Sequence, residues 1–277
     1  MAHAAAARRA VFAGFVVLFA AVMVAEYFFF RRALAALGDL GLAGAALTLY
    51  LLESVLVIVF ALALLSFVAS GLWVYYRAGD TRFLLAAPLP AGGLFTLRVL
   101  ETFGLTSWAL AVVGLPALLA LGTAYGHGGA FYVEGIAVLG LFAILTGSAG
   151  ALLTAIAGAA LRRTRSRLAL ALLVGTVLLA LIGLVGRNVV PSAGDFYAIF
   201  EPGMLNGKPA SIKFIETRFA LWPSHPFAAA LYTAATGDRA GSAATRTTLY
   251  LAPLALLLAV ATVGRALYAR TLPAVAE

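Results

Sequence analysis

The chain has 277 residues, 64% of them hydrophobic and 11% charged, with a mean hydropathy of +1.04. Soluble domains have roughly 45–50% apolar and about 25% charged residues, so this composition excludes an ordinary soluble protein and indicates an integral membrane protein. The net charge of +8 does not indicate a nucleic-acid partner, because the arginines lie mostly in short clusters between apolar runs, as topology determinants do. Cysteine is absent, which excludes disulfides, a thiol nucleophile and thiolate metal ligands.

Long apolar segments of helical character predict an all-α bundle rather than a β-barrel. A spanning helix needs about 20 apolar residues, and six segments meet or approach that length. We place the spans at 10–30, 51–74, 94–120, 131–161, 168–186 and 248–268. The stretch 34–49 is expected to lie partly at the membrane interface. The whole chain, 1–277, is predicted to form a single transmembrane domain.

The first span starts after Arg8-Arg9 and ends in an aromatic run, and it lacks a clean small-residue cleavage site, so we interpret it as a retained helix. Glu26 and Glu53 are acidic residues within or near spans, and a charge in the membrane is a functional candidate by default. Glu26 lies beside interfacial aromatics, and Glu53 lies about one turn from the predicted outer end of its span. A structural role and contact with a substrate both stay open for this possible intramembrane polar site.

Arginine counts in the short loops predict the orientation. The first set of basic residues lies on one side of the bundle: Arg8, Arg9, Arg77, Arg82, Arg162, Arg163, Arg165, Arg167, Arg265 and Arg270. The opposite side has Arg31 and Arg32 in a short loop, and its other basic residues lie in the long segment 187–247. The first set is therefore expected to be cytoplasmic, with both termini inside.

A polar stretch with two arginines and an aspartate interrupts the apolar pattern after the second span and continues into Phe83-Leu-Leu-Ala-Ala-Pro-Leu-Pro90. This density of charge and helix breakers is typical of a short amphipathic helix at the membrane surface, stopped by prolines. An ordinary interfacial loop is the alternative. Just beyond it, Arg98 and Glu101 are predicted to form an exposed i, i+3 pair that anchors the third helix.

Signatures of catalysis are missing from the sequence. It has no Gly-x-x-x-x-Gly-Lys-Ser/Thr loop, no His-Glu-x-x-His motif, and histidines too scattered to indicate a metal site. We therefore predict neither a catalytic residue nor a bound cofactor or metal. Small residues recur at four-residue spacing in the fourth span, at Gly147, Ala151 and Ala155 and at Gly150 and Thr154, and favour close helix packing.

The segment 187–247 is the one long extramembrane piece of the sequence. Short apolar runs broken by prolines, ending in Trp222-Pro-Ser-His-Pro-Phe227, predict interfacial or re-entrant helices rather than a globular domain.

Three features resemble ABC-2-type exporter permeases, in particular one six-helix half of a bacterial exporter group: the run Phe83–Pro90, the Leu94–Arg98 stretch with Ser107-Trp108 after it, and Trp222-Pro-Ser-His-Pro226. The resemblance implies a type V exporter-like bundle in the bacterial cytoplasmic membrane. It implies a permease subunit that exports an amphipathic or lipid-like substrate, is not itself an enzyme, and leaves ATP and Mg to a separate ABC-type ATPase. A second permease copy or homologous half would complete a homo- or heterodimer.

By the same resemblance, the polar stretch is a coupling helix that enters a groove of the ATPase. The residues assigned to it are Asp80, Arg82, Phe83, Leu84, Leu85, Pro88, Leu89 and Pro90. The apolar residues would fill the groove, the charged residues would form ion pairs at its rim, and the prolines would stiffen the exit. Two alternatives are a membrane scaffold protein that moves no substrate and, with less support, a secondary transporter, for which midplane ion ligands or inverted repeats are not evident.

Overall fold

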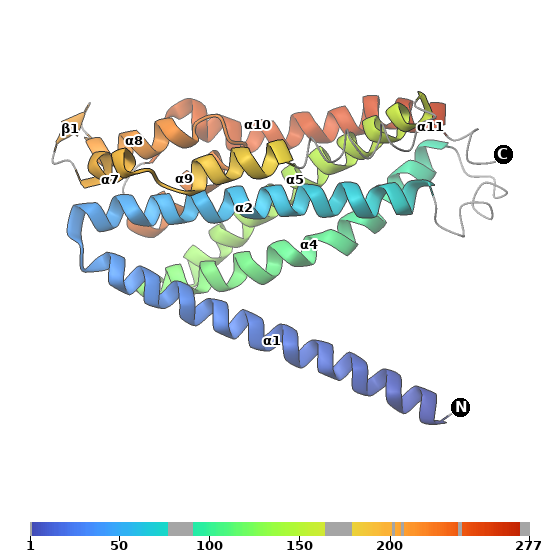
Figure 1. Cartoon of the computed structure of the whole chain (residues 1–277), viewed down its shortest axis with the longest axis horizontal. Helices are drawn as coiled ribbons and strands as arrows, with labels where there is room; N and C mark the ends of the chain where they lie inside the picture. The colour runs from blue at the N-terminus through green and yellow to red at the C-terminus, as the bar shows by residue number, and fades with distance from the viewer. Residues whose placement is uncertain are drawn as a thin grey trace.

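The computed structural model describes residues 2–76, 91–163, 179–200, 203–205, 208–237 and 240–271. Long helices form a bundle, from which the first helix diverges toward its N-terminal end (Figure 1). These elements are α1 (Ala2–Gly38), α2 (Gly41–Tyr76), α4 (Ala91–Ala124), α5 (Gly129–Arg163), α10 (Ala243–Ala259), the π-helical turn η1 (Val260–Gly264) and α11 (Arg265–Thr271). The start of α1 and the end of α11 lie at the same end of the bundle, where α2 ends and α4 begins (Figure 1).

Four helices are long and apolar enough to cross a membrane, which confirms an all-α membrane protein in outline. They cover Phe12–Gly38, Ala43–Tyr75, Gly129–Ala160 and Ala243–Thr271. A fifth span arises if the bent pair Gly92–Trp108 and Leu110–Ala124 is one helix. Five of the six predicted spans therefore have counterparts. Most of the sixth, 168–186, falls outside the described residues, although 179–189 is helical.

The bend in α4 measures 46° and follows two hydroxyl side chains. Thr106 donates to the carbonyl of Thr102 at 2.9 Å, and Ser107 donates to that of Phe103 at 2.7 Å. Side chains that bond the carbonyl one turn back commonly bend helices. The bend carries α4 away from a straight path beside α2 and α5.

The stretch 34–49 contains the end of α1, a turn and the start of α2, and its partial position at the membrane interface stays a prediction. Residues up to Gly38 complete α1, and α2 begins directly after the turn at Gly41, whose φ of 57° suits a residue without a side chain. Ala46 and Leu49 are fully buried within the bundle. The second helix is therefore about ten residues longer at its outer end than its apolar core suggested.

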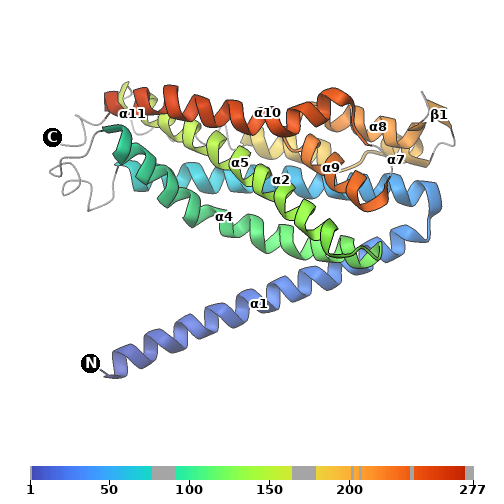
Figure 2. The same cartoon turned by 180° about the vertical axis from the view of Figure 1, so that it is seen from behind.

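Small residues allow α5 to pack tightly against α2 and α4, which confirms the predicted packing seam. A Cβ atom at Gly150 would lie 2.5 Å from the Phe67 ring, and one at Gly147 would lie 2.5 Å from the Phe103 ring. Ala151 and Ala155 are fully buried along the same helix. Figure 2 shows the resulting path, in which α5 crosses the bundle diagonally from the α1 side to α11.

Short elements cover the end of the bundle opposite the termini (Figure 1). We call this set the outer cap, where outer denotes only the end of the bundle opposite the termini: α7 (Ala193–Phe200), the antiparallel strands β1 (Met204–Leu205) and β2 (Lys208–Pro209), α8 (Ala210–Phe219) and α9 (His225–Thr236). The segment after the fifth predicted span thus consists mainly of short helices, as its proline-broken pattern predicted.

The helix α9 enters the bundle rather than resting on it. Its Phe227 ring is fully buried and lies 5.1 Å from the ring of Phe142, which is about 20 Å along α5 from its outer end. At the other end of α9, the Ala235 carbonyl lies 2.6 Å from Nε2 of His127 in the outer α4–α5 loop. Because its first turn lies deep and its last turn lies at the outer surface, α8 and α9 form what we call the re-entrant hairpin.

Candidate functional site

Buried polar side chains meet where the outer cap contacts α2. Tyr50 and Glu53 are three positions apart and therefore lie on one face of that helix. Arg218 of α8 approaches Tyr50, and His225 of α9 approaches Glu53. This site comprises most of the polar contacts that join the cap to a spanning helix among the described residues.

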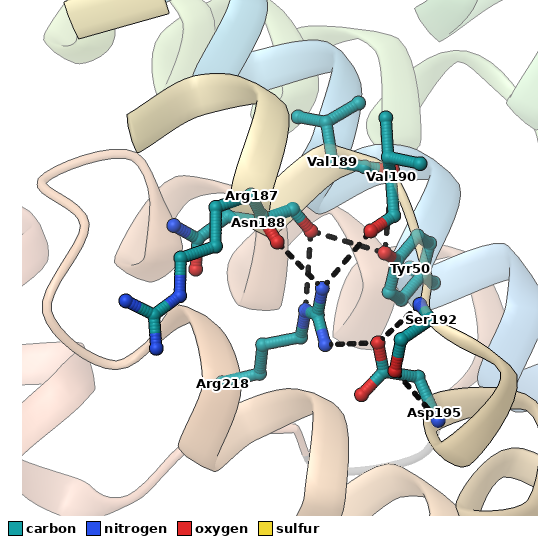
Figure 3. A network of polar contacts seen from close by, with 8 residues as sticks. All are labelled: Tyr50, Arg187, Asn188, Val189, Val190, Ser192, Asp195 and Arg218. Atoms are coloured by element: carbon teal, nitrogen blue, oxygen red, sulfur yellow. Dashed lines mark hydrogen bonds and ion pairs between the residues drawn. The ribbon is translucent and has the colours of Figure 1, made fainter. Parts of the chain in front are cut away.

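The Arg218 guanidinium binds the end of the helix at 179–189 (Figure 3). Nε donates to the carbonyl of Asn188 at 3.1 Å, and Nη2 donates to the carbonyls of Arg187 at 2.8 Å and Val190 at 3.3 Å. The last carbonyls of a helix have no intrahelical partner, and a cation there is stabilised by the helix dipole. Arg218 thereby ties α8 to the segment that enters the cap.

Tyr50 completes this contact from α2. Its hydroxyl donates to the carbonyls of Asn188 at 3.0 Å and Val189 at 3.3 Å, and its ring lies 5.9 Å from the Arg218 guanidinium carbon. The Phe219 ring packs edge-on against it, with centroids 5.4 Å apart. One tyrosine therefore contacts both the entering segment and the re-entrant hairpin.

Asp195 holds the guanidinium from the α7 side, with Oδ2 2.6 Å from Nη1 of Arg218. The same oxygen accepts from the backbone N–H of Ser192 at 2.6 Å, while the Ser192 hydroxyl accepts from the Asp195 N–H at 3.3 Å. This reciprocal pair caps the start of α7. Burial alone would raise the pKa of Asp195, but the bonds from Ser192 and the charge of Arg218 outweigh it and hold that pKa below its usual value.

The second contact is a buried pair between Glu53 and His225. Oε1 of Glu53 lies 2.5 Å from Nδ1 of His225, and the two side chains are 0% and 6% exposed. Among the described residues, the other carboxyl oxygen, Oε2, has no hydrogen-bond partner, and neither does the fully buried hydroxyl of Ser224. His225 is the first residue of α9, so Glu53 lies beside the positive end of that helix.

Glu216 fixes the chain where it leaves the hairpin. Its carboxyl oxygen Oε1 accepts from the N–H of Gly241 at 2.5 Å, and Gly241 has a φ of 76°. The helix α10 starts two residues later. The re-entrant hairpin is thus held at three points: Arg218 in the last turn of α8 binds the end of the helix at 179–189, His225 at the start of α9 binds Glu53, and Glu216 of α8 binds Gly241.

The predicted site residues differ in where they lie relative to this site. Glu53 is part of the site, but it lies twelve residues inside α2 rather than near its end. Glu26 lies on α1, and no hydrogen bond between it and Glu53 occurs in the described part of the chain. The eight residues assigned to a coupling helix lie in 77–90, outside the described residues.

Sequence reasoning missed Arg218, Asp195 and His225. From the sequence, Arg218 counted only as one of the basic residues of the segment 187–247. His225 counted only as one of three histidines that are too scattered to form a metal site. The Ser224-His225-Pro226 order was the available signal, because serine before a helix and proline in its first turn mark a helix start. The Arg98–Glu101 pair forms at 2.8 Å, but the prediction that it would be exposed is wrong for Arg98, which is 1% exposed.

A family model described as "Putative ATP-binding cassette" matches residues 5–276, almost the whole chain. No curated protein matches the chain, and no solved structure matches it. Of these comparisons, the one with the family model gives a match and the other two do not.

This match corrects several predictions. The family is described as an ATP-binding cassette and not as an ABC-2-type permease, so the predicted resemblance is wrong. The predicted role as a permease subunit served by a separate ATPase is wrong for the same reason. The predictions that the chain is not an enzyme, and that ATP and Mg belong to another subunit, are overturned with it.

We tested whether the described residues fit ATP and Mg. Such a site needs backbone N–H groups arranged around phosphates and oxygen ligands for the metal. No cluster of three His, Cys, Asp or Glu side chains that could hold a metal occurs in the described residues. One hollow beside α1 is lined mainly by apolar side chains such as Met23 and Pro116, and another by Phe28 and two helical arginines. These residues do not fit ATP with Mg, and no catalytic step is assigned to them.

Proposed function

Since the chain belongs to the family described as "Putative ATP-binding cassette", we propose that it is a membrane-embedded component of an ATP-driven transport system. The match over residues 5–276 carries this proposal. The four apolar helices of spanning length agree with a role inside the membrane rather than at its surface.

In this proposal the chain is one transmembrane domain of a bacterial cytoplasmic membrane, with the outer cap on the outside and both termini inside. The arginine distribution supports this orientation. The chain works with a transmembrane partner component, either a second copy of itself or a related chain. We assign partner contact to the surface stretch Asp80–Pro90, whose apolar triplet and prolines suit a short docking helix.

The test begins with the tagged full-length chain purified from its native membranes in mild detergent and placed in nanodiscs with every associated subunit retained. Hydrolysis of Mg-ATP is measured against a mock purification, with EDTA removing the metal. A photoreactive ATP analogue then labels the polypeptide that binds nucleotide, and mass spectrometry identifies the labelled peptides.

We expect Mg-dependent ATP hydrolysis that follows the tagged chain through purification, and vesicles whose transport needs ATP but not an ion gradient. The labelled peptides identify where the nucleotide binds, which the described helices alone do not provide. Purified material without nucleotide binding or hydrolysis, or transport abolished by an ionophore while ATP is present, would sink the proposal.

A further inference from the structure

The contact between Glu53 and His225 links two elements that are far apart in the sequence, since the two residues are 172 positions apart. Both side chains are buried, and the helix α9 that carries His225 packs against α2 and α5. The nearby Trp222, at the deep turn of the re-entrant hairpin, is also buried. Separation of this pair therefore requires the deep end of the hairpin to leave α2.

The geometry fixes how many protons this pair holds. One hydrogen must lie between Nδ1 and Oε1, because two bare acceptors cannot approach to 2.5 Å. A neutral imidazole supplies that hydrogen but leaves a negative carboxylate, and no described residue donates to its Oε2. Burial of an uncompensated charge is very unfavourable, so a further proton on the imidazole or on the carboxyl group neutralises the pair.

We propose that Glu53 and His225 form a proton-binding site that holds the re-entrant hairpin against α2, so that release of the hairpin expels a proton and responds to pH. The proton is shared by the pair, and no assignment to one residue is needed. The site responds to the pH of the outer side, which the hairpin enters from.

Other ionisable groups lie on the elements around the pair, and their effects must be separated from those of the pair. They are Tyr50 on α2, Asp195 on α7, Glu216 and Arg218 on α8, Tyr232 on α9, Glu134 on α5, Arg246 on α10 and His127 in the outer loop. Arg218 and Asp195 compensate each other. Glu216 accepts a hydrogen bond from the backbone N–H of Gly241. His127 contacts the far end of α9 and carries a side chain type that titrates in the same pH range, so it requires a control.

The direction of the pH effect follows from the proton count. Once released into water, glutamate titrates near about 4.3 and histidine near about 6.5, so above that pH the released pair holds no extra proton. The docked pair holds one. Rising pH therefore favours release, by up to about tenfold in the release equilibrium per pH unit, until the docked pair also loses its proton.

The experiment uses the full-length chain in lipid nanodiscs between pH 5.5 and 9. Hydrogen exchange of residues 210–236, corrected for the intrinsic pH dependence of exchange, gives the equilibrium for release. A Trp73→Phe/Trp108→Phe variant leaves Trp222 as the single tryptophan of the chain and reports the same event by emission. Glu53→Gln removes the carboxyl group, and His225→Asn removes the imidazole while the asparagine keeps a donor near the position of Nδ1.

We expect the release equilibrium of the unmodified chain to rise with pH only above about pH 6.5. In Glu53→Gln it should be flat above that pH. In His225→Asn the buried carboxyl group still loses its proton on release, so the rise should begin below about pH 6.5. His127→Asn and Glu101→Gln should keep the slope, because neither belongs to the pair. A flat profile in the unmodified chain, a rise above about pH 6.5 that persists in Glu53→Gln, or an unchanged onset of the rise in His225→Asn overturns the proposal. If Glu53→Gln fails to fold, His225→Asn and the tryptophan emission of the unmodified chain still decide it.

Discussion

Arg218 of α8 and Asp195 of α7 are joined by a contact of 2.6 Å between Nη1 and Oδ2, and both are mostly buried although they lie in the cap. The same guanidinium also donates hydrogen bonds to three carbonyls at the end of the helix at 179–189. One side chain thus connects three segments of the outer cap, and its removal should affect all of them together.

Arg218→Ala should therefore loosen the cap. Hydrogen bonds to a charged group contribute about 1.5–3 kcal/mol, and the substitution leaves Asp195 and several carbonyls without their donor, so we expect a loss in that range. Thermal unfolding in nanodiscs measures the loss. Lys213→Ala on the same helix is the matched control, because Lys213 is exposed and should change stability little. Equal losses in the two variants would contradict the assigned role of Arg218.

The cap should also weaken in acid. The pKa of Asp195 is lower in the folded cap than in an unfolded chain, so its charge stabilises the cap above the unfolded value of about 3.9. That stabilisation is lost as the pH falls through the folded pKa. Asp195→Asn should remove this acid dependence while hydrogen exchange of α7 rises at neutral pH. An acid profile that survives the substitution would assign it to other carboxylates.

The packing of α5 predicts that alanine substitutions at two of its glycines change the stability of the protein in opposite directions. Gly150→Ala places a Cβ atom 2.5 Å from the Phe67 ring, close to its backbone end, and should destabilise by about 1–3 kcal/mol. Nothing lies within 4 Å of the position that a Cβ atom at Gly140 would take, so Gly140→Ala should stabilise by about 0.5–1 kcal/mol through helix propensity. Thermal unfolding of both variants checks the seam. If both substitutions change thermal stability in the same direction, α5 does not pack as described.

The proposed role of the stretch Asp80–Pro90 in partner contact predicts that a substitution in it weakens assembly with partner subunits. Phe83→Asp puts a charge where the docking helix is expected to bury an aromatic ring, so retention of partner subunits should fall by at least about tenfold. Co-purification followed by quantitative mass spectrometry measures the retention. Phe83→Leu is the control that keeps an apolar side chain. Full retention by Phe83→Asp would remove this stretch from the contact surface.

The sequence predicts much of the bundle because spans and helix seams depend on local patterns. About 20 apolar residues indicate a crossing, and Gly147, Gly150 and Ala151 indicate close packing, whatever their partners are. The predicted start of α2 at position 51 was too late, because Leu42–Tyr50 before it is apolar like the residues after it. The turn at Gly41, with its positive φ, marks where the helix begins.

The site was harder to predict because it depends on register between distant segments. Nothing in the local sequence sets His225 against Glu53, since the depth to which the re-entrant hairpin enters depends on packing of Phe227 against Phe142. Arg98 shows the same difficulty. Its pairing with Glu101 is local and was predicted, whereas its burial depends on neighbouring helices and was not.

The position of α9 also determines which end of the bundle can move. With the outer ends of α2 and α5 held together by the hairpin, a rigid tilt of α2 pivots near Glu53. Tyr75 lies about 33 Å further along that helix, so a tilt of about 5° displaces it by about 3 Å. Its ring packs on Phe95 and Tyr268, with centroids 5.8 Å away in both cases. This aromatic cluster is where a small rotation at the fixed end becomes the largest displacement.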